Sequence, residues 1–96
     1  MLLAGNYRFR SSADPAIALK RFLAWTPPTG YTIKNHWSRA DGMGGLLIIE
    51  SDSPAILLEA SAPYSDVLDI EFIPLIDITE AVPILQSALN WRESVR

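Results

Sequence analysis

The sequence predicts an α+β domain with a four-stranded antiparallel sheet, two helices on one of its faces and a further helix at the C-terminus. Three observations predict it. Several stretches alternate apolar and polar residues, prolines open the helical stretches, and the elements follow the order β-α-β-β-α-β. That order is the ferredoxin-like, or split βαβ, arrangement. A chain of 96 residues is the size of one such domain, which we expect to span residues 1–96.

The first strand and the first helix are predicted by residues 2–24. Between residues 2 and 10, apolar side chains recur at even spacing, which is typical of a strand with one buried face. Asp14 and Pro15 then start a helix, because aspartate accepts hydrogen bonds from free backbone amides and proline fits the first helical position. We expect the apolar stripe of this helix to be buried. The stripe comprises Ile17, Leu19, Phe22 and Leu23.

Residues 31–39 and 46–50 predict two strands joined by a glycine-rich hairpin loop over residues 40–44. The first of these strands alternates strictly, which places Trp37 on the face that the helices cover and His36 on the other face. The second is almost continuously apolar, so both of its faces are expected to be covered. We place Leu46 and Ile48 on the helix-covered face, and Leu47 and Ile49 on the opposite face.

The rest of the chain predicts a second helix, a fourth strand and a C-terminal helix. A step that ends in Pro54 starts the second helix, and Pro63 stops or bends it. Alternation over residues 67–73 predicts the fourth strand. Asp77 followed by Glu80 resembles a capping box, which starts the last helix. The apolar stripe of that helix contains Val82, Leu85, Ala88 and Leu89.

One face of this sheet is expected to need a partner. Right-handed connections place the first and third strands in the centre and the fourth strand beside the first. The face away from the helices then carries many apolar side chains and is too apolar to be left in water. These side chains are Leu2, Ala4, Leu47, Ile49 and Ile73. We therefore expect a homodimer with two-fold symmetry, the commonest arrangement.

Charge and composition exclude several classes of function. The chain has a net charge of −3 and no cysteine. This argues against nonspecific nucleic-acid binding and excludes disulfides, thiolate metal sites and cysteine nucleophiles. No apolar run is long enough to span a membrane, and residues 1–7 lack the features of a signal peptide. We expect a cytoplasmic protein without membrane or nucleic-acid partners.

The charges are also unevenly distributed along the chain. Residues 1–39 carry six basic side chains and one acidic one, whereas residues 40–91 carry nine acidic side chains and no basic one. Because the first and fourth strands are expected to be antiparallel neighbours, opposite charges on them are expected to pair across the sheet. The basic residues concerned are Arg8 and Arg10, and the acidic ones are Asp69 and Glu71.

The segment from Asn35 to Glu80 resembles an uncharacterised bacterial domain family of about this length. The matching residues are Trp37, Gly44, Gly45, Glu50, Asp52, Pro54, Ala55, Tyr64, Ser65, Asp66, Leu68, Glu71 and Pro74. Tyr64 stands where the family pattern has a tryptophan. The resemblance implies a dimeric α+β barrel. It implies no activity, because the wider superfamily includes monooxygenases, haem-degrading enzymes, isomerases and ligand-binding domains, and a shared fold does not carry a shared reaction.

Four residues are candidates for a site. His36 is the only side chain whose ordinary pKa lies near neutrality, which makes it the first candidate for a general base. Asp66, in the loop before the fourth strand, is a second catalytic candidate that would orient a polar group. Trp37 and Tyr64 are candidates for binding an apolar ligand, although Trp37 also fits a core position. We expect no metal site and no cofactor.

Two classes of function remain open from the sequence. The first is a non-catalytic dimeric module that holds a small apolar ligand or docks to a protein partner. The second is a cofactor-independent enzyme, similar to monooxygenases or isomerases, that acts on a small apolar substrate. The first is favoured because the sequence shows no convincing acid–base pair. An enclosed cavity that is lined by Trp37 and that His36 or Asp66 reaches would favour the enzyme, whereas a cavity filled by side chains would favour the interaction module.

Overall fold

The structure, a computed structural model, describes residues 1–96 and contains every predicted element. In chain order these are β1 (Leu2–Phe9), α1 (Pro15–Ala24), β2 (Tyr31–Ser38), β3 (Gly44–Ser51), α2 (Pro54–Ser61), the 3-10 turn η1 (Ala62–Tyr64), β4 (Leu68–Pro74) and α3 (Ile78–Ser94). The predicted α+β class and the β-α-β-β-α-β order with an added C-terminal helix are therefore confirmed.

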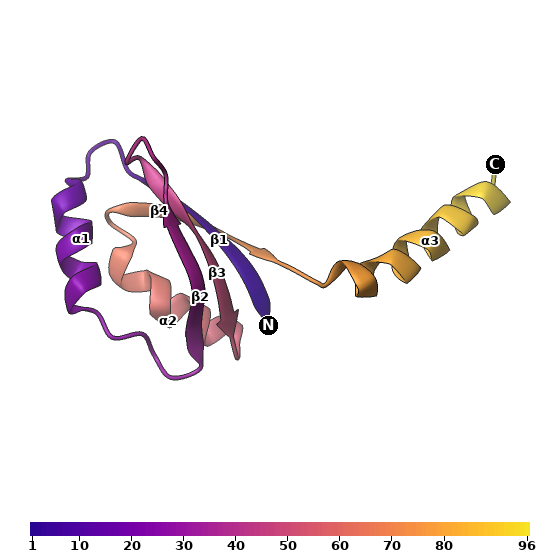
Figure 1. Cartoon of the computed structure of the whole chain (residues 1–96), viewed down its shortest axis with the longest axis horizontal. Helices are drawn as coiled ribbons and strands as arrows, with labels where there is room; N and C mark the ends of the chain where they lie inside the picture. Colours follow the sequence, from indigo (N-terminus) through magenta and orange to yellow (C-terminus); the bar gives the residue numbers. More distant parts are fainter.

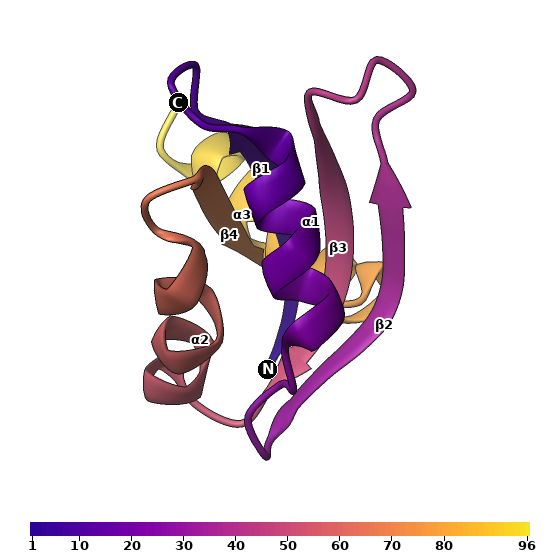
Figure 2. The same cartoon turned by 90° about the vertical axis from the view of Figure 1, so that its left-hand side faces the viewer.

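The four strands form one antiparallel sheet in the order β2-β3-β1-β4. This is the ferredoxin-like order, with β1 and β3 in the centre as predicted. Helices α1 and α2 lie on one face of the sheet, whereas α3 projects away from the other side (Figure 1). Figure 2 shows α1 and α2 side by side over the covered face. We call the uncovered side of the sheet the open face.

The helices begin where the sequence predicts, because each has a capping side chain. Asp14 accepts a hydrogen bond from the Ala16 amide at 2.9 Å, and Asp77 accepts one from the Thr79 amide at 2.9 Å. Ser53 caps α2 by accepting from an amide one turn on, at 3.2 Å. These bonds satisfy amides that have no partner within the helix. Hydrogen bonding to Thr79 also lowers the pKa of Asp77.

The predicted face assignments are wrong in β3 and in the part of β2 that follows Ile33. An irregularity between Ile33 and Asn35 breaks the strict alternation of β2. One extra residue reverses the faces beyond it, so His36 lies under the helices and Trp37 lies on the open face, 52% exposed. The expectation that Trp37 belongs to the core is therefore wrong.

The phase of β3 is also opposite to the prediction. Leu47 and Ile49 are buried beneath the helices, whereas Leu46 is 41% exposed and lies opposite Trp37 in the ladder. A run of consecutive apolar residues has no polar alternation that fixes its phase. The assignments in β1 and β4 were correct, because Tyr7, Phe9, Ile70 and Phe72 all face the helices.

The core is small and divided. One cluster contains Leu3, Leu47 and Ile49, and the other contains Ala18, Tyr64 and Val67. The predicted burial of the α1 stripe is wrong, because Leu19 and Leu23 are 58% and 75% exposed. No residue of α3 is buried. The apolar side chains of α1 therefore do not fill the space beneath that helix, and α3 is not covered by the rest of its own chain.

One predicted charge pair across the sheet is present. The Arg10 guanidinium lies 3.2 Å from the Asp69 carboxylate, between β1 and β4. In the ladder, Asp69 stands directly opposite Arg8, and Glu71 stands opposite Asn6 rather than opposite an arginine. The prediction that the basic and acidic halves meet at this strand pair is confirmed for Arg10 and Asp69.

Candidate functional site: an aromatic cavity under the helices

A cavity of about 410 Å³ lies between the helix layer and the covered face of the sheet. Seventeen residues line it, of which fourteen are hydrophobic. Seven of the nine aromatic side chains in the chain are among them: Tyr7, Phe9, Phe22, Trp25, Tyr31, Tyr64 and Phe72. The cavity exists because α1 places only the small side chain of Ala18 in a buried position, so the larger side chains around it do not fill the space.

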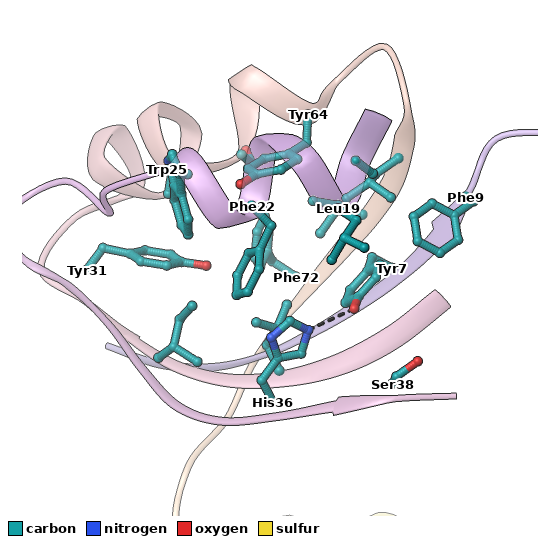
Figure 3. Close-up of a pocket in the computed structure, with 17 residues that line it drawn as sticks. Tyr7, Phe9, Leu19, Phe22, Trp25, Tyr31, His36, Ser38, Tyr64 and Phe72 are labelled. Carbon is teal, nitrogen blue, oxygen red and sulfur yellow. Dashed lines mark hydrogen bonds between the residues drawn. The ribbon is translucent and has the colours of Figure 1, made fainter. Parts of the chain in front are cut away.

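The aromatic rings form the walls of this cavity by packing edge to face. The Trp25 ring stands nearly perpendicular to that of Tyr64, at 86° with centroids 5.5 Å apart, and meets Tyr31 at 71° and 6.0 Å. Figure 3 shows these rings around one end of the hollow, with Phe22 projecting from α1 toward His36. Edge-to-face contacts fix ring orientation, so the aromatic walls are ordered before any ligand arrives.

Two polar side chains of the lining face each other, and His36 remains exposed to solvent. The Tyr7 hydroxyl and the His36 Nε2 atom are hydrogen-bonded at 2.8 Å (Figure 3). Partial removal from water lowers the pKa of His36 and raises the pKa of Tyr7. Both groups are therefore neutral near pH 7, and the histidine tautomer decides which of them donates. The pair is a compact hydrogen-bonding spot on an otherwise apolar wall.

A third polar atom in the cavity has no partner. Tyr64 is only 7% exposed, and its buried hydroxyl makes no hydrogen bond. Burial raises the pKa of this phenol, which keeps it protonated. A buried hydroxyl without a partner costs about 1–3 kcal/mol. The hydroxyl is thus a buried hydrogen-bonding group in the cavity wall that the chain itself leaves unused.

An ion pair holds α1 in place above the hollow. Arg21 donates to both carboxylate oxygens of Asp66, at 2.5 and 2.9 Å, and to the Pro63 carbonyl oxygen at 3.0 Å. The hydrogen bond from Arg21 is the main reason that the pKa of Asp66 lies below its ordinary value. A bidentate arginine–carboxylate pair has a defined geometry. Asp66 therefore joins α1 to the segment that follows η1.

The structure brings two of the four candidate residues together and separates the others. His36 and Tyr64 both line the cavity. Asp66 lies outside it in the ion pair, and Trp37 lies on the open face. Tyr7 and Trp25 were missed as site residues. Tyr7 gave no signal because its contact with His36 joins positions 29 residues apart, and a tryptophan near a helix end is usually structural.

The position of His36 gives a prediction about pH. Its pKa in the folded protein is lowered below the ordinary value of about 6.5. The unfolded chain therefore binds a proton that the folded chain does not, so stability is greatest above about pH 6.5 and falls as the pH drops below it. We expect the urea midpoint to decrease between pH 7 and pH 5. His36→Gln should flatten that decrease.

The carboxylates provide the control for this measurement. Asp41, Asp66 and Asp77 all have lowered pKa values and titrate at more acid pH than His36. Their effect on stability therefore appears below about pH 4, from the ordinary carboxylate values. A decrease between pH 7 and pH 5 that persists unchanged in His36→Gln would contradict the assignment to His36.

The chain is a small ferredoxin-like domain with an aromatic cavity between its sheet and its helices. A family model described as "Domain of unknown function (DUF3303)" matches residues 1–89, so the chain belongs to this family. The match covers the sheet, both covering helices and most of α3. No curated protein and no solved structure matches the chain. Membership of an uncharacterised domain family is thus confirmed.

The structure contains neither a cluster of metal ligands nor a membrane-spanning helix. No group of three or more histidine, aspartate or glutamate side chains is arranged to hold a metal ion. No helix is both long enough and apolar enough to pass through a bilayer. The aromatic cavity is the feature on which a function can be argued.

Proposed function

We propose that the chain is a non-catalytic ligand-binding module for a small, planar, mostly apolar molecule that carries a hydrogen-bonding oxygen. The cavity beneath α1 is the observation that carries this proposal. Its volume of about 410 Å³ lies within the range of about 300–1,000 Å³ that is usual for small-molecule sites. An apolar lining with a few polar groups is also typical of such sites.

The lining indicates the chemistry of the ligand. Flat rings supply most of the walls, so a planar molecule makes the largest contact area with them. The Tyr7–His36 pair offers hydrogen bonds to a ligand, and a ligand that displaces the ring of Tyr64 slightly would give its unpartnered hydroxyl a partner. No arginine or lysine lines the cavity, which disfavours a ligand with a buried negative charge. A neutral phenol or a similar aromatic alcohol matches these features.

The first test is a titration with 1-naphthol, a planar apolar probe with one hydroxyl group. We expect saturable binding to the wild-type chain, measured by calorimetry and by quenching of tryptophan fluorescence, since Trp25 lines the cavity. Ala18→Leu, which enlarges a buried lining residue, should weaken binding at least tenfold. Ala16→Leu is the matched control, because it adds the same atoms to an exposed position of α1.

Three outcomes of this titration are informative. Tyr64→Phe should weaken binding several-fold, because about 1 kcal/mol of hydrogen bonding is lost. The same change should raise the melting temperature of the ligand-free chain, because it removes a buried hydroxyl that has no partner. Absence of binding up to the solubility limit of 1-naphthol would contradict the proposal, and so would equal weakening by Ala16→Leu and Ala18→Leu.

We also propose that the module works as a homodimer through the open faces of its sheets, as in a dimeric α+β barrel. The supporting observation is the apolar character of that face. Ile48, Ala4 and Ile73 form one row across β3, β1 and β4, and the exposed side chains of Trp37 and Leu46 pair in the next row. Two copies that meet at this face cover each other's apolar side chains.

The Tyr7–His36 pair favours a second candidate function. A neutral histidine in an apolar cavity is suited to accept a proton from a bound substrate, as in a cofactor-independent enzyme of the monooxygenase or isomerase type. Mass spectrometry of the 1-naphthol probe after incubation with the protein in air distinguishes the two candidates. Unchanged probe supports the binding module. Chemical conversion that His36→Gln abolishes, with probe binding retained, supports the enzyme.

A further inference from the structure

We propose that α3 is an arm that clasps the second copy of the homodimer, so that its apolar stripe packs against the partner and not against its own chain. The inference rests on the homodimer proposed above and goes beyond it, because it assigns a role to a helix outside the sheet. It is carried by the exposure of α3, by the apolar stripe in its sequence, by the surface area of the chain and by the side of the sheet on which α3 lies.

The exposure of α3 shows that its own chain does not cover it. The helix has 17 residues and none is buried. Its large apolar side chains are between 46% and 67% exposed: Ile78, Val82, Ile84, Leu85, Leu89 and Trp91. A helix of this length with an internal proline, Pro83, is marginally stable alone in water. Its stability therefore depends on a partner surface.

The sequence of α3 has one apolar stripe with polar residues beside it, while Ile84 and Trp91 lie outside this stripe. Ile78, Val82, Leu85 and Leu89 recur at helical spacing and form one stripe. Gln86 and Asn90 lie on another side and are joined by a hydrogen bond of 3.0 Å. This pattern is typical of a helix that packs along one stripe and is solvated along the other.

The connection to the sheet directs α3 away from its own chain. The Leu75 amide donates to the Leu2 carbonyl oxygen at 2.9 Å, which extends the β4–β1 pairing by one residue. Asp77 already caps the helix. Only Ile76 lies between the paired end of β4 and the N-cap of α3, so a short connection links the helix to the sheet. Figure 1 shows the helix leaving on the side opposite α1 and α2.

The surface area agrees with a buried dimer interface. The chain exposes 6863 Å², whereas a folded monomeric protein of this mass exposes about 5,500 Å². The excess of roughly 1,400 Å² is larger than the roughly 800 Å² that each partner buries in a standard interface. The radius of gyration is likewise 17.3 Å, against about 12.5 Å for a compact domain of this length.

The placement of α3 makes the second copy the partner that fits best. The helix and the open face lie on the same side of the molecule (Figure 1), so a protein seated on that face also meets α3. One two-fold dimer then covers both apolar surfaces of both chains. A membrane surface fits less well as the partner, because helices that bind membrane surfaces are usually rich in lysine and arginine. The charged residues of α3 are Glu80, Arg92 and Glu93.

The test compares two aspartate substitutions in the full-length chain by analytical ultracentrifugation from 1 to 100 µM. Leu85→Asp places a charge on the apolar stripe, and Gln86→Asp places the same charge on the adjacent polar position. Both side chains are exposed in one copy, so neither change disturbs buried packing within that copy, and Gln86→Asp loses only the exposed hydrogen bond to Asn90. We expect Leu85→Asp to raise the dimer dissociation constant at least 100-fold and Gln86→Asp to change it less than threefold.

Hydrogen exchange provides a second measurement that does not depend on a variant. In the wild-type chain, α3 amides should exchange more slowly at 100 µM than at 1 µM, whereas the rates of amides at the centre of β1 should stay constant. A dimer with equal affinity in wild type and Leu85→Asp, or α3 exchange independent of concentration, would overturn the arm and leave the homodimer standing. A wild-type chain that is monomeric at 100 µM would overturn both the arm and the homodimer. Binding of that monomer to vesicles of phosphatidylcholine and phosphatidylserine would show that α3 contacts a membrane surface instead.

Discussion

Replacing Ile49 by alanine is expected to lower the free energy of unfolding by about 3–4 kcal/mol, a typical loss for a fully buried isoleucine. Ile49 is 0% exposed and belongs to a core cluster with Leu3 and Leu47. Only 11 of the 96 residues are buried, so few other contacts compensate for the loss. Small domains have only about 5–15 kcal/mol of total stability. Urea denaturation at a fixed protein concentration measures this change.

Ile48 provides the matched control, because it is the same residue type one position earlier on the same strand. It lies on the open face and is partly exposed. Ile48→Ala should therefore cost about 1 kcal/mol or less within one chain, since a smaller apolar area is removed from cover. It should also weaken dimerisation, which appears as a weaker dependence of the midpoint on protein concentration, because less of the folded chain is held in the dimer. A larger loss for Ile48→Ala than for Ile49→Ala would contradict the face assignment of β3.

The contrast between these two residues explains which parts of the fold were predictable. The positions of the helices follow from local chemistry, because capping residues such as Asp14 and Asp77 act within one turn. Strand order follows from connection rules. The face of each β3 residue does not follow from local chemistry, because consecutive apolar residues read the same in either phase.

His36 shows the same limit in β2. Strict alternation from Tyr31 predicts the open face for it, and the irregularity after Ile33 reverses this outcome. A bulge has no obligatory residue type unless its geometry requires glycine, so nothing in this sequence announces it. The sequence therefore identifies His36 as a candidate site residue only through the ordinary pKa of its imidazole. Its position beside Tyr7 is seen only in the structure.

The cavity itself could not be predicted from the sequence. The aromatic residues that line it come from three strands, α1 and the segments after α1 and α2, so no spacing along the chain relates them. The apolar stripe of α1 was interpreted as a filled core. In the structure, part of that stripe borders an empty volume, because Leu19 and Phe22 stay 58% and 40% exposed. Whether the apolar stripe of a helix fills the space beneath it or only lines a cavity depends on the distance between the helix and the sheet. The pattern of apolar residues in the sequence does not determine that distance.

Replacing Gly45 by alanine is expected to cost about 3 kcal/mol or more and to abolish binding of the naphthol probe. A β-carbon at this position would collide with the Tyr7 hydroxyl and would lie 2.5 Å from the Trp37 carbonyl oxygen. The carbonyl belongs to the neighbouring backbone and cannot move aside without disturbing the sheet. Overpacking a fitted interior usually costs about 1–3 kcal/mol, and more against rigid groups. Urea denaturation and the probe titration measure the two effects.

Gly42→Ala separates this steric effect from the general cost of losing a glycine. Gly42 has a φ of +73° and no atom within 4 Å of an added β-carbon. Its replacement should cost about 1–2 kcal/mol through backbone strain and leave probe binding intact. Equal losses at both glycines would show that Tyr7 does not lie over Gly45.

A double variant shows whether Gly45 serves the Tyr7–His36 pair. In a Tyr7→Phe background the closest collision is gone, so Gly45→Ala should cost less than it does in the wild type, and the difference is the coupling between the two positions. The ring of Tyr7 lies over Gly45 because the two are paired across β1 and β3. A positive coupling would mean that the missing side chain at Gly45 is what allows the phenol to reach His36. The glycine would then have a direct part in building the polar spot of the cavity.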